Sequence, residues 1–403
     1  MSNPSFLHNV DGLRRALSLM QDHGSASLDR LPKELPEHGA GEDAVLEMLA
    51  PIVLGGARQL GARTAFAHMD PPTPWITWAM ALWNASLNQN LLHPDVAPVA
   101  RDVEARIVRW LAPEFGMDGG HMTPGSSVSN ITGLWAAREI TGARSVVSSS
   151  AAHLSITKAA NLLGLDHQIV PVDALGQIDA TALGEISDSI LVLTAGTTNT
   201  GAIDPLELAG QAAWTHVDAA WCGPMRLSAE YTARLDSIDC ADSVAVSAHK
   251  WFFQPKESAL IFFQDSAKAH DALTFGGSYL SAPNIGVLGS HGAVAVPLLA
   301  TLMTFGRRGI GDLIDVAMVG IEKVRVVLKD NNAEVHPASS NGVLLWRDPN
   351  RTADEIIFAL PPGSASTTKL DGIEWVRHVA ANPNFHPGEF CEVLQEAVWK
   401  HSP

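Results

Sequence analysis

A lysine among aromatic residues, Lys250, is the side chain of this 403-residue sequence best suited to covalent chemistry. It follows the apolar segment 243–247 and precedes Trp251, Phe252 and Phe253. Apolar surroundings lower the pKa of a lysine and free its amine to form a Schiff base with an aldehyde. A lone lysine more often extends its ammonium group into water. The residue therefore suggests amine chemistry without establishing it.

Two further polar residues follow apolar segments. Asp218 lies at the end of the segment 214–219. A buried carboxylate needs a cationic or N–H partner, although an aspartate here could equally cap the next loop. His153 follows the segment 145–149. Its imidazole could stack on a flat ligand, donate a hydrogen bond or simply fill the core.

A turn of small residues, Gly125-Ser126-Ser127-Val128-Ser129-Asn130, precedes an apolar helical stretch. Hydroxyl residues at a helix start can bind phosphate, although they are also typical of an ordinary N-cap. Turn, histidine, aspartate and lysine follow one another along the chain. Together they fit pyridoxal phosphate, which has a phosphate, a flat ring, a ring nitrogen that needs an acid and an aldehyde that needs an amine.

Short apolar runs that alternate with helical stretches must position these residues. We predict buried strands at 145–149, 168–172, 190–195, 214–219, 243–247, 259–263 and 343–346, and helices at 97–111, 206–212 and 311–330, with a further helix ending at 161–164. This alternation is typical of an α/β unit with a largely parallel sheet, which binds ligands at the carboxyl ends of its strands. The first 50 or so residues look polar and helical, interrupted by a proline-rich stretch at 31–36.

The composition excludes several partners. With 27 Lys and Arg against 43 Asp and Glu, the net charge of −16 argues against binding to nucleic acid or to an anionic membrane surface. The longest apolar stretch, 293–305, contains Pro297 and is shorter than the ~20 residues of a membrane span. Three widely spaced cysteines predict neither a disulfide framework nor a metal site, so we expect a cytoplasmic protein without a metal.

In this order the motifs resemble those of the group II pyridoxal-phosphate-dependent amino-acid decarboxylases, the family of glutamate, 2,4-diaminobutyrate and aromatic amino-acid decarboxylases. The resemblance covers about 65–309, with a weaker part at 375–383. It rests on Phe66-Ala67-His68-Met69-Asp70-Pro71-Pro72, Leu87-Asn88-Gln89-Asn90, Gly196-Thr197-Thr198 with Gly201 and Asp204-Pro205, His216-Val217-Asp218-Ala219-Ala220-Trp221, and Asp242-Ser243 leading to His249-Lys250-Trp251.

The resemblance implies pyridoxal 5'-phosphate as cofactor and decarboxylation of an L-amino acid to its amine and CO2. Lys250 would hold the cofactor as an internal aldimine and later move protons at the substrate carbon. Asp218 would pair with the ring nitrogen, while His153 and Ala220 would pack on the two ring faces. Positions that match phosphate contacts are Ser126, Ser127, Ser243 and His249, and Thr198 matches a position near the ring and the substrate.

Other reactions on the same cofactor stay open: oxidative deamination coupled to decarboxylation, transamination or C–C lysis. The family usually has a loop tyrosine that returns a proton to the substrate carbon, whereas here Tyr279 is the only tyrosine after Lys250. His291 stands where relatives often have arginine, and it could be the proton donor or only a surface residue. In relatives, loss of this donor permits aldehyde formation. A cofactor-binding protein without turnover is disfavoured because Lys250, Asp218 and His153 are all present.

The implied architecture is an α/β fold of the pyridoxal-phosphate-dependent transferase type (fold type I) with a mostly parallel central sheet. We expect an N-terminal helical arm at 1–60, a large cofactor-binding domain at 61–309 and a small C-terminal α+β domain at 310–403. Relatives of this fold are usually homodimers, so we also expect a homodimer. The expected partner is a small-molecule substrate, an amino acid whose side chain the sequence does not identify.

Overall fold

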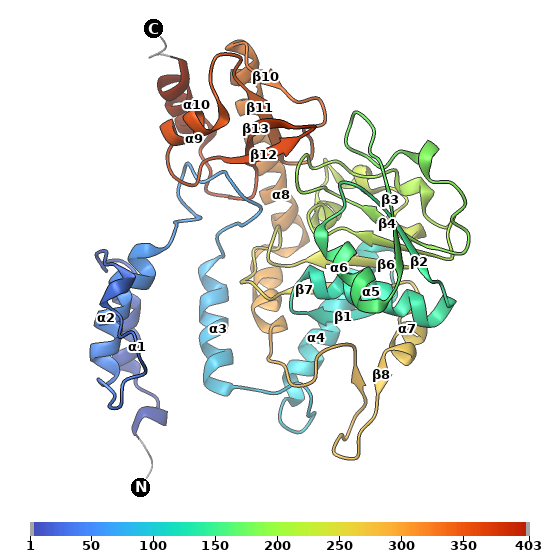
Figure 1. Ribbon diagram of the computed structural model, residues 1–403. Coiled ribbons are helices and arrows are strands. Elements are labelled where there is room, and N and C mark those ends of the chain that lie inside the picture. The colour runs from blue at the N-terminus through green and yellow to red at the C-terminus, as the bar shows by residue number, and fades with distance from the viewer. Residues whose placement is uncertain (1–3, 400–403) are drawn as a thin grey trace. The chain divides into compact units, whose positions relative to one another are not determined.

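A seven-stranded β-sheet forms the centre of the unit Leu60–Pro403 in the computed structural model, which describes residues 4–399 (Figure 1). The strand order is β1-β7-β6-β5-β4-β2-β3. Strands β2 to β6 are parallel, and β7 runs antiparallel to both β6 and β1. The strands are β1 (Gly119–Thr123), β2 (Ser145–Ser149), β3 (Asp166–Val170), β4 (Ile190–Thr194), β5 (Trp214–Asp218), β6 (Ser243–Ser247) and β7 (Ala259–Phe263). This sheet confirms the predicted α/β class.

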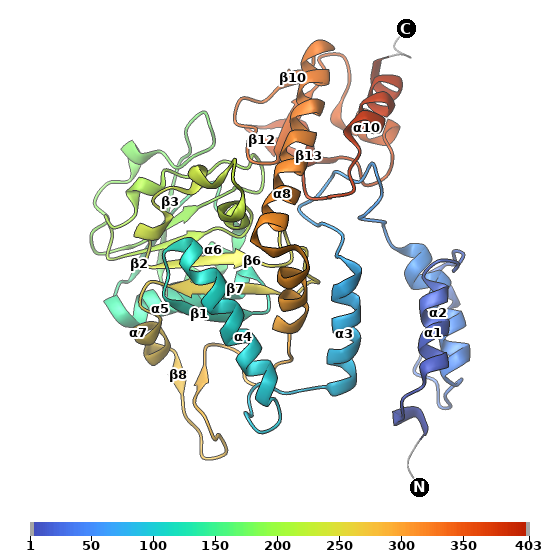
Figure 2. The same ribbon diagram turned by 180° about the vertical axis from the view of Figure 1, so that it is seen from behind.

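Helices cover both faces of this sheet. Helices α5 (Ser126–Thr141), α6 (Leu154–Leu163) and α7 (Ser266–Ala272) lie on one face (Figure 1). Helices α4 (Pro98–Leu111) and α8 (Ala295–Asp330) lie on the other (Figure 2). Successive residues of β4 explain both layers, because Ile190 and Val192 pack toward α5 whereas Leu191 and Leu193 pack toward α4 and α8. Strands β4 and β7 are buried on both faces and therefore read as continuous apolar runs, which made them visible in the sequence.

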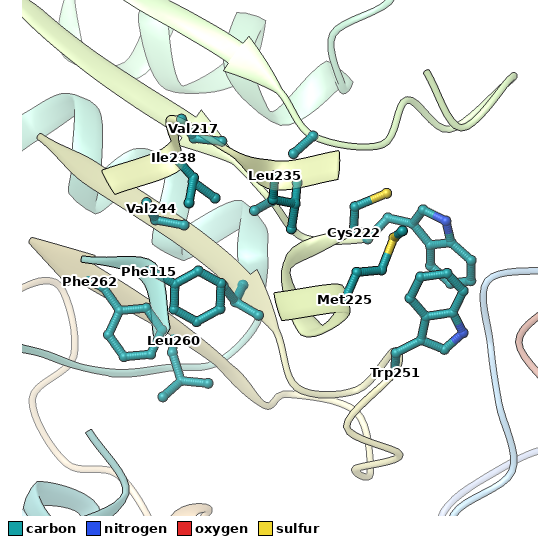
Figure 3. Close-up of a cluster of buried hydrophobic side chains, with 14 of the residues drawn as sticks. Phe115, Val217, Cys222, Met225, Leu235, Ile238, Val244, Trp251, Leu260 and Phe262 are labelled. Carbon is teal, nitrogen blue, oxygen red and sulfur yellow. The ribbon is translucent and has the colours of Figure 1, made fainter. Parts of the chain in front are cut away.

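The larger core lies between the sheet and the second helical layer. Figure 3 shows Val217, Val244, Leu260 and Phe262 from the sheet packed with side chains of the connecting segments. Trp251 belongs to the same cluster, and its ring lies 4.0 Å from that of Trp221, measured between centroids. The residues around Lys250 are therefore anchored in the main core.

Three elements around the central sheet differ from the sequence prediction. Strand β1 was missed because Gly119, Gly120 and His121 interrupt its apolar pattern. The predicted helix at 206–212 is wrong, since the chain forms only a 3-10 turn over Leu206–Leu208 before Gly210 takes a positive φ of 82°. Helix α8 begins at Ala295 instead of 311, and non-helical angles at Gly306 mark a kink within it.

The C-terminal part forms a second sheet of four antiparallel strands in the order β10-β11-β13-β12. Its elements are β10 (Glu334–Val335), β11 (Val343–Arg347), α9 (Ala353–Ala359), β12 (Ser366–Leu370), β13 (Ile373–Val379) and α10 (Pro387–Leu394). Only β11 was predicted as a strand. The proposed domain boundary after 309 falls inside α8, whereas contacts divide the chain only between Gln59 and Leu60. The boundary at 309 therefore stays a prediction.

The unit Met1–Gln59 contains α1 (Val10–Leu19) and α2 (Glu42–Gly56) in its described part. An ion pair between Arg15 and Glu47 joins the two helices. The remaining elements of the larger unit are α3 (Trp75–Leu87) and a short hairpin of β8 (Thr274–Phe275) and β9 (Asn284–Ile285). Across residues 4–399, none of the helices combines the length and the apolar character that crossing a membrane requires.

Candidate active site

Six of the ten predicted site residues meet in one pocket, because five strands end at the same edge of the central sheet. Strand β1 runs in the same direction as β6, since both are antiparallel to β7. The segments that follow β1, β2, β4, β5 and β6 therefore all emerge at the carboxyl edge. One small pocket at this edge is lined by Ser126, His153, Thr194, Gly196, Thr198, Asp218, Ala220 and Lys250.

Lys250 sits in a tight turn directly after β6. Its carbonyl accepts a hydrogen bond from the Phe253 N–H at 2.8 Å, and Phe253 takes a positive φ of 57°. Trp251 anchors the turn, because its indole N–H donates a hydrogen bond to the Ala380 carbonyl at 3.0 Å. Burial lowers the pKa of Lys250, and the carboxylates of Asp218 and Asp70 partly oppose this shift. A buried amine with a lowered pKa is suited to nucleophilic attack on an aldehyde.

Asp218 ends β5 with its carboxylate buried at the pocket wall. One oxygen accepts a hydrogen bond from the Asn130 side-chain amide at 2.8 Å, and the other accepts from the Ala220 N–H at 3.2 Å. Two fixed donors hold the carboxylate in one orientation. This orientation would suit pairing with a protonated ring nitrogen, a role that stays a prediction.

His153 is the N-cap of α6. Its Nδ1 accepts a hydrogen bond from the Ser155 N–H at 3.2 Å and lies 2.8 Å from the Ser155 hydroxyl. Burial lowers the pKa of His153; Asp218 opposes the shift, and Lys250 and Lys158 add to it. The ring is therefore neutral near pH 7, since even an unperturbed histidine has a pKa of about 6.5. A neutral, fixed ring on the pocket wall can stack on a flat ligand.

Ser126 begins α5, and Gly125 is the N-cap with a φ of 123°. The first N–H groups of a helix have no carbonyl within the helix to which they can donate, so they are available to an anion. A Cβ added at Gly125 would meet no atom within 4 Å, which leaves open space beside these donors. Ser126 lines the pocket and Ser127 is exposed at the same turn. This turn fits a phosphate group.

Buried hydroxyl groups at the carboxyl edge provide an independent test of the cofactor assignment. Thr194 ends β4, Ser247 ends β6 and Ser149 ends β2, and the hydroxyl of each is buried without a hydrogen-bond partner among the described residues. Buried polar groups normally have partners. Thr194 lines the pocket together with Lys250, Asp218 and Ser126, and its unpaired hydroxyl fits a polar ligand there. The residues present therefore fit pyridoxal phosphate.

Ser243 does not reach this site, and its assignment to the phosphate has no support in the structure. It begins β6 and pairs in register with His216, two positions before Asp218. Its buried hydroxyl accepts from the Trp214 indole N–H at 2.9 Å and lies 2.8 Å from Nδ1 of His216. Ser247, at the opposite end of the same strand, was missed. The direction of the strand could have identified it, since only its carboxyl end faces the pocket.

His249 lies beside Lys250 but outside the lining of the pocket. Its Nδ1 donates to the Ser258 carbonyl at 3.1 Å, which leaves Nε2 as the free ring nitrogen. Burial lowers the pKa of His249 to about 4, and Lys256 and Lys250 add to the shift. A neutral ring would offer only a lone pair at Nε2, so His249 can donate to a phosphate only if the bound dianion raises its pKa. Its phosphate role stays a prediction.

His291 and Tyr279 both lie away from Lys250 within this chain. His291 lines a different cavity together with Glu104 and His121, and its Nδ1 donates to the Gly289 carbonyl at 2.8 Å. Tyr279 is 74% exposed, on the segment that connects β8 and β9. The single chain therefore does not bring His291 to the pocket, and its role as proton donor stays an untested prediction.

The structure adds two residues that sequence reasoning missed. Asn130, one turn into α5, contacts Asp218 directly. Arg377 on β13 donates to the Thr198 carbonyl at 2.8 Å and to the Ala67 carbonyl at 3.2 Å. Burial lowers the pKa of Arg377 to about 10. A buried arginine needs acceptors, and those of Arg377 lie on other segments of the chain. The strand pattern alone therefore gave no signal for this residue, which connects the second sheet to the Thr198 loop.

A mostly parallel sheet with lysine, aspartate, histidine and a phosphate-type turn at its carboxyl edge is the arrangement of a pyridoxal phosphate enzyme of fold type I. Comparison with known proteins then gives the family. Residues 25–303 match the model described as "Pyridoxal-dependent decarboxylase conserved domain". The chain belongs to this family; its cofactor is pyridoxal phosphate and it is a carboxy-lyase.

Named relatives are consistent with this assignment. The chain is 32% identical to an L-2,4-diaminobutyrate decarboxylase of Rhizobium meliloti (strain 1021), over 89% of this chain and 82% of the relative. The same-named enzyme of Acinetobacter baumannii is 26% identical, over 57% of this chain and 54% of the relative. The fold matches Oryza sativa TDC with PLP and tryptamine, with a TM-score of 0.86 at 19% identity over 98% of this chain and 99% of that one. The family model and the sequence relatives favour decarboxylation over the other reactions of the cofactor, and the structural match shows the fold.

Proposed function

We propose that this protein removes the α-carboxylate of an L-amino acid and releases the amine and CO2. Lys250 carries the cofactor and moves protons at the substrate carbon. Asp218 holds a proton on the ring nitrogen, and His153 stacks on the ring opposite Ala220. The bound cofactor supplies an acceptor for the electron pair that is left when the bond to the carboxylate breaks.

One observation carries this proposal: the amine of Lys250 and the carboxylate of Asp218 line the same small pocket at the carboxyl edge of the sheet. The helix start at Ser126 lies on the same pocket wall and can hold the phosphate. Binding of the phosphate and of the ring would fix the substrate, so that the bond to the carboxylate can stand perpendicular to the ring.

For the substrate we propose an L-amino acid of the 2,4-diaminobutyrate class as the first candidate. The support is the 32% identical relative of that name, which matches most of both chains. The test incubates the holoenzyme with 2,4-diaminobutyrate and with the common amino acids, and measures CO2, amine, aldehyde and peroxide. Amine without peroxide is the expected product. Aldehyde with peroxide would contradict simple decarboxylation.

The cofactor role of Lys250 can be tested by spectroscopy. Lys250→Ala should lose the visible absorbance of the lysine-bound cofactor, because Lys250 is the one amine among the described residues that line the pocket. Lys268→Ala is the matched control, since Lys268 is an exposed lysine on α7. An unchanged spectrum in Lys250→Ala would refute the assignment.

We also propose a homodimer. Helix α3 exposes an apolar stripe within its own unit, formed by Trp75, Trp78, Leu82, Trp83 and Leu87. Exposed apolar stripes of this kind typically mark protein interfaces. Trp83→Glu should lower the molar mass measured by light scattering from that of a dimer to that of a monomer, whereas exposed Glu374→Lys should not. A monomeric wild type would refute the proposal.

Cytoplasmic location is likewise our proposal. Its support is that Cys222, Cys240 and Cys391 are all free thiols. A reducing compartment keeps thiols in this state. Fractionation of cells that produce the full chain would test it, and recovery outside the cytoplasmic fraction would contradict it.

A further inference from the structure

Behind the pocket, buried polar side chains form one continuous hydrogen-bonded chain. It connects Trp214, Ser243, His216, Asn130, Ser155 and His153, and Asn130 also contacts Asp218. All members except His153 are buried, so water cannot replace a missing partner. Each donor and acceptor in the chain must therefore be satisfied from within.

The direction of every hydrogen bond follows from groups with only one possible role. The carboxylate of Asp218 only accepts, so the Asn130 atom 2.8 Å away is the amide nitrogen, and the amide oxygen must face His216. Nε2 of His216 lies 3.0 Å from that oxygen and therefore carries a proton.

The same logic extends to Ser243. Burial lowers the pKa of His216 to about 4, so the ring is neutral and has a single N–H. Nδ1 of His216 must then accept from the Ser243 hydroxyl at 2.8 Å. The Ser243 oxygen in turn accepts from the Trp214 indole N–H, which can only donate.

The other branch ends at His153. The second N–H of Asn130 donates to the Ser155 hydroxyl oxygen at 2.9 Å, which directs the hydroxyl hydrogen toward Nδ1 of His153 at 2.8 Å. The backbone N–H of Ser155 donates to the same nitrogen. Nδ1 therefore carries the lone pair, and the single proton of the neutral ring is on Nε2.

We propose that Asn130, Ser155, His216 and Ser243 are positioning residues whose one-directional hydrogen-bond chain fixes His153 as the Nε2–H tautomer and, through the same Asn130 amide, fixes the Asp218 carboxylate. His153 then presents an N–H donor, not a lone pair, to a molecule in the pocket that it lines. Because Asn130 donates to both branches, a substitution of Asn130 should alter the orientation of both His153 and Asp218. This role rests on the proposed function only for its effect on turnover, since the tautomer is a property of the chain itself.

The test reads the tautomer directly, without the reaction. Ring nitrogen shifts are measured by NMR on nitrogen-15 histidine-labelled protein with and without cofactor, and the His153 signals are assigned by their loss in His153→Gln. The expected wild-type result is a bare Nδ1 and a protonated Nε2 in His153 and in His216. A His153 ring protonated on Nδ1, or an equal mixture of tautomers, would overturn the proposal.

Two variants then test the connection. Asn130→Asp keeps the shape but replaces the amide donors by acceptors, and Ser155→Ala removes the hydroxyl while keeping the backbone donor. Both should shift the His153 ring signals toward a mixture of tautomers and lower kcat roughly tenfold or more, with a smaller change in KM. Thr132→Val, two residues after Asn130 on α5, is the control, because its hydroxyl donates only to the Val128 carbonyl of its own helix. Unchanged His153 signals in both folded variants would overturn the proposal, whether or not the wild type decarboxylates an amino acid.

Discussion

Gly133 in the middle of α5 should resist a substitution that ordinarily stabilises helices. Replacing a mid-helix glycine by alanine gains about 1 kcal/mol of helix propensity. At Gly133, however, the new Cβ would lie 2.6 Å from both Cε1 and Nδ1 of His216. That is about 0.8 Å short of the 3.4 Å at which ordinary contact begins. The His216 ring would have to move.

The ring has little freedom to do so. Hydrogen bonds of 2.8 Å to Ser243 and 3.0 Å to Asn130 hold it on both sides. Overpacking costs about 1–3 kcal/mol, and a buried group that loses its partner costs about 1–3 kcal/mol more. Against a gain of about 1 kcal/mol, Gly133→Ala should destabilise the protein by roughly 1–5 kcal/mol.

The assay measures the thermal midpoint and kcat of the Gly133→Ala holoenzyme and of a control variant in which a second buried helix glycine is replaced. Gly320 is also buried within a helix, α8, but a Cβ there would meet Phe385 at an ordinary 3.5 Å. Gly320→Ala should therefore raise the midpoint or leave it unchanged, whereas Gly133→Ala should lower it. Because Asn130 would move with His216, kcat of Gly133→Ala should also fall roughly tenfold to a hundredfold. A Gly133→Ala enzyme as stable and as active as wild type would refute the steric reasoning and the tight fit of the chain.

Three further predictions follow from single side chains. Asp218→Ala should keep the visible absorbance of the Lys250-bound cofactor but lower kcat about a hundredfold, and activity within about threefold of wild type would contradict its role. Burial lowers the pKa of His216 and of His378 to about 4, so only the unfolded chain binds these protons when the pH first falls below about 6.5. The free energy of unfolding should therefore fall by up to about 3 kcal/mol per pH unit toward pH 4. A thermal midpoint that is independent of pH would contradict this. Asp204→Ala leaves two buried backbone N–H groups unpaired and should lower the free energy of unfolding, measured in urea, by about 2–5 kcal/mol. A decrease below about 1 kcal/mol would contradict this prediction.

The part of the site that the sequence predicted consists of residues at the ends of apolar strands. Asp218 and Lys250 could be found because a charged residue directly after a buried run is conspicuous. Strands that begin with polar residues or glycines were harder to predict. Strand β1 was missed because its two glycines and its histidine are typical of a loop. The second sheet was mostly missed because polar residues interrupt the apolar pattern of β12 and β13.

The differences between the predicted residues and the pocket lining have another cause, because a residue type does not state which end of a strand it occupies. Ser243 and Ser247 are serines at the two ends of β6, and only Ser247 lies at the carboxyl edge. Asn130 and Arg377 depend on partners from other elements, Asp218 and Thr198 respectively, so no local pattern could identify them. For His291 a local motif suggested chemistry, but the position depends on how the segment after β9 folds back, which that motif does not encode.

Helix α5 explains why binding and positioning are coupled in this fold. Ser126, Asn130 and Gly133 are four and then three positions apart, so they share the helix face that packs on the sheet. The first offers N–H donors at the pocket, the second orients Asp218 and His153, and the third leaves room for His216. A ligand bound at the helix start therefore rests on the element that also holds the polar chain behind the pocket. Substitutions that tilt α5 without touching the pocket should consequently lower cofactor affinity and turnover together, whereas substitutions on its opposite, solvent-facing side should affect neither.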